Sequence, residues 1–189
     1  MNAADVLVLG GGASGLVSAI TAAEQGDRVC VLEAQNRLGR KILASGNGRC
    51  NLMNLNEPVY YGETGFAAEV LRACPPERIR EFWHRHGLLL RDNGGGLMYP
   101  CTFKSSSVME ILLQAVQKER TDIRLGQRAI RILQDAEGFK VTTLTGESFF
   151  AGRLILATGD RHSPGWGEEA TRRFFCSPSG TRRFRMNLP

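Results

Sequence analysis

Apolar runs separated by glycines set the pattern of the first 33 residues. The run Val6-Leu7-Val8-Leu9 meets a glycine cluster at 10–12, and a second apolar run ends at Glu33. Residues 13–25 lie between them and predict a helix, for which Gly26 is a natural stop. We therefore expect strands over 5–9 and 28–33 that a right-handed helical crossover joins as a parallel pair.

Further along, the pattern predicts two helices and several short strands. Pro75-Pro76 opens a helix to about residue 86, and Ser107 with Glu110 forms a capping box for a helix to about residue 120. A proline marks the run 97–100 as a short edge strand. Hairpin turns then separate three strands, and an apolar run that ends in Thr158-Gly159 reads as a buried parallel strand. These four strands are expected at about 122–133, 138–144, 147–150 and 154–157.

The glycine cluster matches the spacing G-x-G-x-x-G of a dinucleotide site. Gly10 allows the tight turn, Gly12 lets the backbone approach a pyrophosphate, and Gly15 lets the helix pack on the strand. The free amides and the dipole at the helix N-terminus favour the pyrophosphate charge. Glu33, 18 positions past Gly15, would accept the ribose hydroxyls of an adenine dinucleotide.

A secretory signal or a membrane span is the alternative interpretation of residues 6–23. No Lys or Arg precedes the run, Asp5 stands in front of it, and Glu24-Gln25-Gly26-Asp27 interrupts it too early for a span. We therefore expect a cytoplasmic protein without a membrane partner.

The order of the later elements separates two classes of nucleotide-binding protein. A plain NAD-binding domain continues with alternating strands and helices, whereas here a helix and an antiparallel meander precede the strand that ends in Ala157-Thr158-Gly159. That order is typical of flavoproteins with two dinucleotide-binding folds. The expected fold class is therefore α/β, a Rossmann-like FAD-binding domain over 1–160, with a plain NAD-binding domain as the less favoured alternative.

Charge and cysteine content indicate which partners and ligands the chain is not expected to have. Of the net charge of +5, the segment 161–189 contributes most, with six arginines against two glutamates. No RNP, zinc or helix-turn-helix pattern accompanies these arginines, so we expect no nucleic-acid partner. The five cysteines lack C-x-x-C spacing, and His84 and His86 point in different directions on a helix, so neither disulfides nor a metal site is expected.

The stretch 39–51 is rich in glycine, cations and amides. Composition alone favours a solvated loop. Its position after the Glu33 strand, however, would place it along the strand ends where the phosphates and the redox ring of a dinucleotide lie.

The chain resembles the BaiN-like (YhiN-like) family of bacterial FAD-dependent oxidoreductases over about residues 4–159. The resemblance rests on Val8 to Leu16, Glu33, Leu38-Gly39-Arg40-Lys41, Gly48-Arg49-Cys50-Asn51, Tyr99-Pro100 with Lys104-Ser105 and Val108, and Leu154 to Gly159. The Gly-Arg-Cys-Asn block is far more specific than the glycine turn.

The resemblance implies a role for each matching position. The pyrophosphate would be lined by Gly10, Gly12, Ala13, Ser14 and Gly15, and Glu33 would hold the adenosine ribose. Ala129 would read adenine through its backbone, and Thr158 with Gly159 would close over the phosphates. The remaining positions would balance phosphate charge or approach the flavin: Arg40, Lys41, Gly48, Arg49, Cys50 and Asn51. NAD(P)H is the expected hydride donor, and the substrate is an unspecified small molecule.

The end of the chain departs from the family. Asp160 stands where a second glycine is expected, and no substrate domain follows, so a C-terminal half that completes the flavin pocket is expected to be missing. We interpret 161–189 as an atypical Arg-rich tail. A shifted reading frame over 175–181 could encode the apolar helix that the family has next, so a frameshift near residues 160–170 is expected. A genuine short disordered tail is the alternative.

Function is therefore expected to be hydride or electron transfer through flavin, with a catalytically inactive dinucleotide-binding fragment as the alternative. No acid, base or nucleophile can be named. Cys50 has a suggestive position beside Arg49, which could favour a thiolate, but a packed inert thiol is the simpler interpretation.

Overall fold

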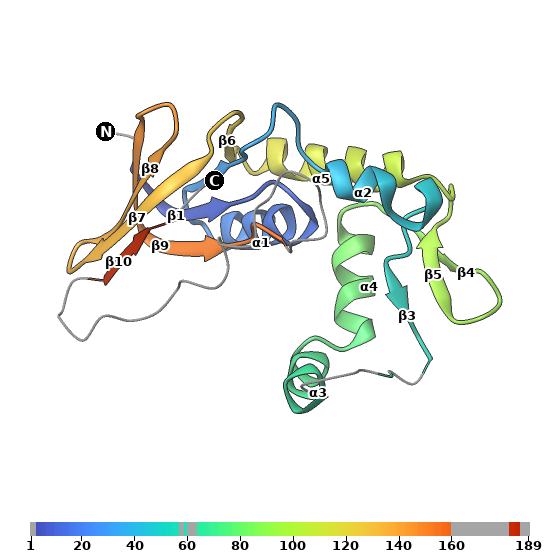
Figure 1. The fold of residues 1–189 in the computed structure, drawn as a ribbon. Helices are drawn as coiled ribbons and strands as arrows, with labels where there is room; N and C mark the ends of the chain where they lie inside the picture. The colour runs from blue at the N-terminus through green and yellow to red at the C-terminus, as the bar shows by residue number, and fades with distance from the viewer. Residues whose placement is uncertain (1–2, 57–58, 60–63, 160–181, 186–189) are drawn as a thin grey trace. The chain divides into compact units, whose positions relative to one another are not determined.

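The structure is a computed structural model that describes residues 3–56, 59 and 64–159 and the backbone of 182–185 (Figure 1). The chain divides into two compact units. The sheet unit consists of Met1–Gly39 and Val116–Pro189, and the inserted unit consists of Arg40–Ala115.

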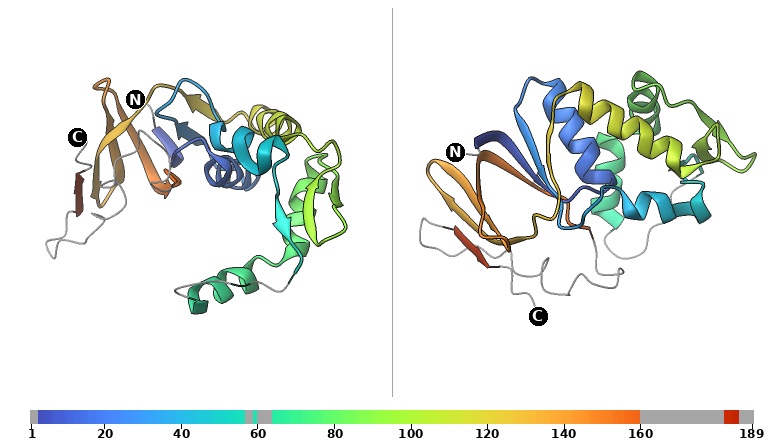
Figure 2. Two further views of the ribbon diagram at one scale, coloured as in Figure 1. Left: turned by 45° about the vertical axis from the view of Figure 1, so that its right-hand side comes forward. Right: turned by 90° about the horizontal axis from the view of Figure 1, so that it is seen from above.

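The sheet unit is built on one seven-stranded sheet with the order β10-β7-β8-β9-β1-β2-β6. Helix α1 (Ala13–Glu24) connects β1 to β2 and packs on one face of the sheet (Figure 2). The strands are β1 (Ala3–Leu9), β2 (Val29–Leu32), β6 (Asp122–Arg124), β7 (Ala129–Asp135), β8 (Gly138–Thr143), β9 (Ser148–Leu156) and β10 (Arg182–Arg185).

The predicted β-α-β unit is confirmed. Strand β1 pairs in parallel with β2, with Val6 opposite Val29 and Leu9 opposite Leu32. Alternate residues of β1 enter two different core clusters, because successive side chains of a strand point to opposite faces. Val6 and Val8 pack under α1, together with Ala19, Val29 and Val31. Both faces of these strands are therefore covered, which explains their uninterrupted apolar sequence.

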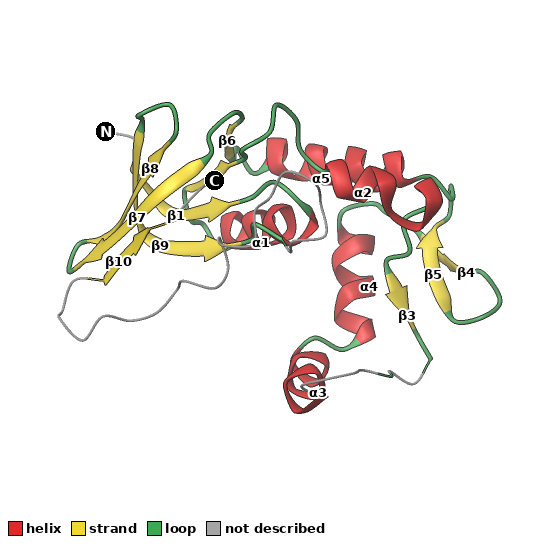
Figure 3. Cartoon of the chain, viewed as in Figure 1, coloured by secondary structure: helices red, strands yellow, loops and turns green. Residues whose placement is uncertain are grey.

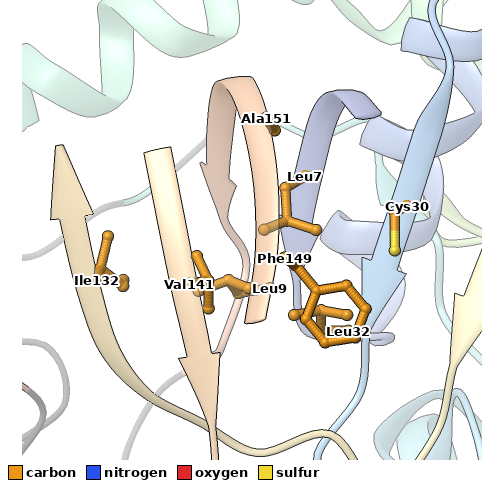
Figure 4. Packing of buried hydrophobic residues seen from close by; sticks show 8 residues of the cluster. All are labelled: Leu7, Leu9, Cys30, Leu32, Ile132, Val141, Phe149 and Ala151. Atoms are coloured by element: carbon orange, nitrogen blue, oxygen red, sulfur yellow. The ribbon is translucent and has the colours of Figure 1, made fainter. Parts of the chain in front are cut away.

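The other face of the sheet forms the second core cluster (Figure 4). It joins the parallel strands to the meander, and its members come from β1, β2, β7, β8 and β9: Leu7, Leu9, Cys30, Leu32, Ile132, Val141, Phe149 and Ala151. Cys30 is 6% exposed, and burial raises the pKa of its thiol to about 12, which keeps it neutral. It is a core residue.

The boundaries of the meander strands differ from the prediction. The single strand expected over 122–133 is two strands, since the chain turns at Gly126, whose φ is +69°. The strands expected at 147–150 and 154–157 are one continuous strand, β9. Its first half pairs antiparallel with β8, and the strand pairs in parallel with β1 as far as Leu156. The hairpin turn predicted between 135 and 138 is confirmed, because Asp135 pairs with Gly138.

Part of the tail also differs from the prediction. Arg182–Arg185 form β10, which pairs antiparallel with β7, although the tail shows no strand period. An edge strand is held by backbone hydrogen bonds, so it can form without alternating apolar residues. Residues 160–181 and 186–189, with the suggested change of reading frame, lie outside the described residues.

The inserted unit combines helices with a three-stranded sheet of order β3-β5-β4 (Figure 3). Strand β5 is therefore central rather than the predicted edge strand; Pro100 is its last residue. The predicted capping box is also wrong, because the helix begins at Ser105, two residues before Ser107. The elements are α2 (Arg40–Ala44), the 3-10 turn η1 (Ser45–Gly48), β3 (Met53–Asn54), α3 (Thr64–Ala73), α4 (Pro76–Arg85), β4 (Leu90–Asp92), β5 (Leu97–Pro100) and α5 (Ser105–Lys118), whose last residues belong to the sheet unit.

The described part of the chain contains free cysteines and no helix suited to span a membrane. Its four cysteines, at positions 30, 50, 74 and 101, are free thiols. None of the helices in 3–56 and 64–159 combines the length and the apolar content needed to cross a membrane.

An ion pair between Asp5 and Arg28 gives the sheet unit a pH-dependent contact. The Asp5 carboxylate accepts hydrogen bonds from Nε, Nη2 and the backbone amide of Arg28 at 2.8–3.1 Å. These bonds lower the pKa of Asp5 from 3.8 to about 2. The stabilisation is therefore present at neutral pH and is lost as the pH falls from about 4 toward 2.

We expect Asp5→Asn to lower the urea midpoint of unfolding at neutral pH. The difference from the wild type should shrink as the pH is lowered through that range, because the Asp5 carboxylate is then protonated more readily in the unfolded chain than in the folded one. Urea denaturation at a series of pH values measures this. A difference that stays constant from neutral pH to pH 2 would contradict the assignment.

Candidate dinucleotide site

The turn between β1 and α1 accepts glycine alone at two positions. Gly10 has φ of +110°, and a Cβ there would overlap the carbonyl oxygen of Ala157. A Cβ on Gly15 would overlap the carbonyl oxygen of Gly10. Close packing of helix, turn and neighbouring strand therefore demands both glycines, as the sequence predicts.

Gly12 differs from these two glycines, because a Cβ on it would meet no atom within 4 Å. Its backbone is extended, and it caps α1 without a side-chain hydrogen bond. The first helical hydrogen bond runs from the Leu16 amide to the Gly12 carbonyl, and no acidic residue lies in the first turn. Ala13 and Ser14 are exposed. The helix thus presents its positive end, with uncovered amides, to open space beside Gly12.

Glu33 lies next to this turn and is only 7% exposed. Its Oε2 accepts a hydrogen bond of 2.6 Å from the Gly11 amide, and its Oε1 accepts one of 2.8 Å from the Gln35 amide. Each carboxylate oxygen keeps a further lone pair, so both can accept from a vicinal diol. The arrangement places a helix N-terminus, which favours negative charge, beside a carboxylate that can accept further hydrogen bonds.

Gly11 has no role in the G-x-G-x-x-G pattern but is closely packed in the structure. A Cβ at this position would overlap the Leu38 side chain and lie 3.1 Å from Oε2 of Glu33. The third consecutive glycine was the available signal, since a site that needs only Gly10 and Gly12 does not require one between them.

The residues that follow β9 lie beside the glycine turn. The Ala157 amide donates to the Leu9 carbonyl at 2.9 Å, which sets the Ala157-Thr158 peptide beside Gly10. Gly159 follows with φ of +80°. The backbone of Thr158 therefore lies next to the glycine turn, and Gly159 follows it in the chain.

Ala129 lies farther along the same unit, at the first position of β7 and opposite Thr143. It is half-buried against the core cluster of Figure 4. The segment that precedes it is hydrogen-bonded to the backbone at Glu33, which connects this strand to the hydroxyl acceptor.

The other predicted site residues belong to the inserted unit. Arg40 and Lys41 lie on α2, and the block Gly48-Arg49-Cys50-Asn51 begins at the last residue of η1. The stretch forms α2 and η1 rather than a loop without secondary structure, and most of its residues are exposed. The backbone has positive φ at Gly46, Asn47, Gly48 and Cys50. The amide of Cys50 donates to the Ser45 carbonyl, and its side chain is 6% exposed.

This turn touches the segment that contains Tyr99 and Pro100. The amide of Leu52 donates to the Met98 carbonyl at 2.9 Å, and a Cβ on Gly46 would lie 3.9 Å from the Tyr99 ring. The structure therefore brings together two of the sequence blocks that carry the family resemblance. The predicted residues form two groups, one in each unit.

No group of three or more His, Cys, Asp or Glu side chains in the described residues is arranged to hold a metal ion. Within the sheet unit, the candidate site consists of backbone amides at the N-terminus of α1 and the buried carboxylate of Glu33.

Two curated relatives resemble the chain. It is 38% identical to the 3-dehydro-bile acid delta(4,6)-reductase of Clostridium scindens, in a match that covers 87% of this chain and 41% of that protein. It is 28% identical to the ribosomal RNA dihydrouridine synthase of Escherichia coli, over 88% of this chain and 42% of that protein. The chain thus spans about two-fifths of the length of these relatives.

Solved structures share the fold. Thermovibrio ammonificans THI4 superposes with a TM-score of 0.57 and 20% identity, and the match covers 83% of this chain and 58% of that one. Residues 4–180 match the family described as the HI0933-like protein Rossmann domain, whose members are FAD-binding oxidoreductases. This match and the 38% identical relative confirm the expected resemblance and the α/β, Rossmann-like fold class. The chain belongs to the HI0933-like family.

Proposed function

We propose that the chain holds FAD for an oxidoreductase that takes hydride from NAD(P)H and reduces a small molecule. The observation that carries the proposal is the open helix end at Gly12 next to the buried carboxylate of Glu33. Gly10 and Gly15 allow the close packing around it, so the residues present fit a dinucleotide.

Each predicted residue receives a role in this proposal. The amides of Gly12, Ala13, Ser14 and Gly15 bind the pyrophosphate, and Glu33 accepts the ribose hydroxyls. The Ala129 backbone contacts adenine, and Thr158 with Gly159 closes over the phosphates. As the family resemblance implies, the positions that would balance phosphate charge or approach the flavin are Arg40, Lys41, Gly48, Arg49, Cys50 and Asn51.

FAD, when bound, supplies the acceptance and release of a hydride. The chain's own residues bind and orient it, and we assign no acid or base. The 38% identical relative, which is named for the reduction of a 3-dehydro-bile acid, supports an organic small molecule as the substrate. We also propose a cytoplasmic location.

The first test is retention of flavin. The purified full chain is mixed with FAD, desalted and scanned for visible flavin absorbance, with FAD alone passed through the same column as the control. Flavin bands that remain with the protein support the proposal. A colourless protein, together with no change in FAD fluorescence on titration, would overturn it.

A catalytically inactive dinucleotide-binding fragment is the second candidate. It is favoured by one observation: the chain spans about two-fifths of the length of its curated relatives. NAD(P)H oxidation by the FAD-loaded chain separates the two candidates. Flavin that is bound but not reduced by NADH or NADPH would favour the fragment, with a C-terminal half as the missing partner.

A further inference from the structure

The loop between β6 and β7 lies beside the segment that carries Glu33. The Glu33 amide donates to the Arg124 carbonyl, the Gln127 amide donates to the Glu33 carbonyl, and the Gly126 amide donates to the Gln35 carbonyl, each at 2.9 Å. The loop therefore continues the pairing of β2 with β6 past the ends of both strands. Any shift of residues 126–127 moves the backbone at Glu33.

The side chain of Gln127 ties the same loop to the turn between β8 and β9. Its Nε2 donates to Oε1 of Glu147 at 2.7 Å, and its Oε1 accepts from the Thr145 hydroxyl at 2.9 Å. Thr145 in turn lies 2.9 Å from the hydroxyl of Thr143, which is fully buried. The amide therefore uses its donor and its acceptor at once, and the network is anchored in the core.

This network lies between the two predicted contacts to adenosine. Gln127 is bonded through its backbone to Glu33, the ribose acceptor, and it precedes Ala129, the adenine contact, by two residues. Apolar burial contributes little here, because Leu125 is 43% exposed and Gly126 has no side chain. Polar contacts must therefore hold the loop.

We propose that Gln127 is a positioning residue for the adenosine end of FAD, acting through its hydrogen bonds to Thr145 and Glu147. The inference rests on the proposed function, since it assumes that FAD binds at Glu33 and Ala129. Gln127 sets the spacing between the ribose acceptor and the adenine strand before the ligand arrives, and this preorganisation lowers the ordering cost of binding.

The test measures the affinity of the full chain for FAD and, separately, for ADP, which carries only the adenosine half. We expect Gln127→Ala to weaken both by the same factor, about tenfold, with little change in the thermal midpoint of the ligand-free chain. Thr142→Ala, which removes a 3.4 Å hydroxyl contact to Ser148 on the same hairpin, is the matched control and should bind both ligands normally.

Variants of the partner residue separate positioning from general damage. Glu147→Ala should weaken FAD and ADP binding as Gln127→Ala does, and the double variant should bind no more weakly than either single variant. Glu147→Gln should bind both ligands as the wild type does, because its amide oxygen still accepts from Gln127. Wild-type affinity in Gln127→Ala, or a loss for FAD without one for ADP, would overturn the inference alone. If the wild type binds neither ligand, the proposed function fails and this inference with it.

Discussion

Gly12→Val is expected to abolish FAD binding while the chain stays folded. A Cβ at Gly12 meets no protein atom within 4 Å, and the extended backbone there suits a β-branched residue. The valine methyl groups would instead fill the space in front of the first amides of α1. Because hydrogen bonds between those amides and a phosphate are charge-assisted, we expect the FAD affinity to fall by at least about 100-fold. Fluorescence titration with FAD and thermal denaturation measure the two effects.

Gly15→Val is the matched control, because it changes the same residue type three positions away. Its Cβ would overlap the Gly10 carbonyl, so this variant should lose thermal stability as well as binding. If Gly12→Val bound FAD as the wild type does, the pyrophosphate would not lie at this helix end.

Glu33→Gln is expected to weaken both the fold and the site. The carboxylate accepts from two backbone amides, at Gly11 and Gln35, in a position that is 7% exposed. A glutamine can satisfy only one of them, and its own NH2 group would face the other donor. We expect the free energy of unfolding to fall by about 2 kcal/mol, since one buried donor is left unpaired.

The same substitution removes an acceptor for the ribose hydroxyls, so FAD affinity should fall by a further factor of about 10–30. Urea denaturation and FAD titration separate the two losses. Glu137→Gln, in the exposed turn between β7 and β8, removes the same charge without touching the site. Glu33→Gln with the stability and FAD affinity of the wild type would refute the assigned role.

The first three elements were predictable because glycines mark their ends. Gly10 follows β1 and Gly26 lies just past α1, and the ends of both elements differ from the predicted ends by at most two residues. The four-residue apolar run 29–32 needed no alternation, since a strand covered on both faces shows none. Local residues were sufficient for this unit.

The later errors came from treating local signals as boundaries. Separate strands were expected at 147–150 and 154–157, but β9 runs through the gap, because pairing with both β8 and β1 holds the strand extended. Pro100 suggested an edge strand, yet as the last residue of β5 it costs the central strand little. Partners distant in sequence decided both outcomes, and no local pattern reports them.

In the candidate site too, local patterns predicted some residues, and contacts between distant residues decided the rest. The spacing of the glycines and Glu33 predicted residues that the structure places together. Gly11 and Gln127 were missed, because their roles depend on contacts with residues at least 18 positions away, such as Glu33 and Glu147. No motif encodes such a contact.

The pairing of β9 with β1 has a consequence for how the chain is made. Strand β1, within the first nine residues, is held on one side by β2 and on the other by residues 150–156. During synthesis, more than 150 residues must therefore leave the ribosome before β1 gains its second neighbouring strand. Until then one edge of β1 is an open pairing surface, so chaperone capture of nascent chains should end only after β9 emerges.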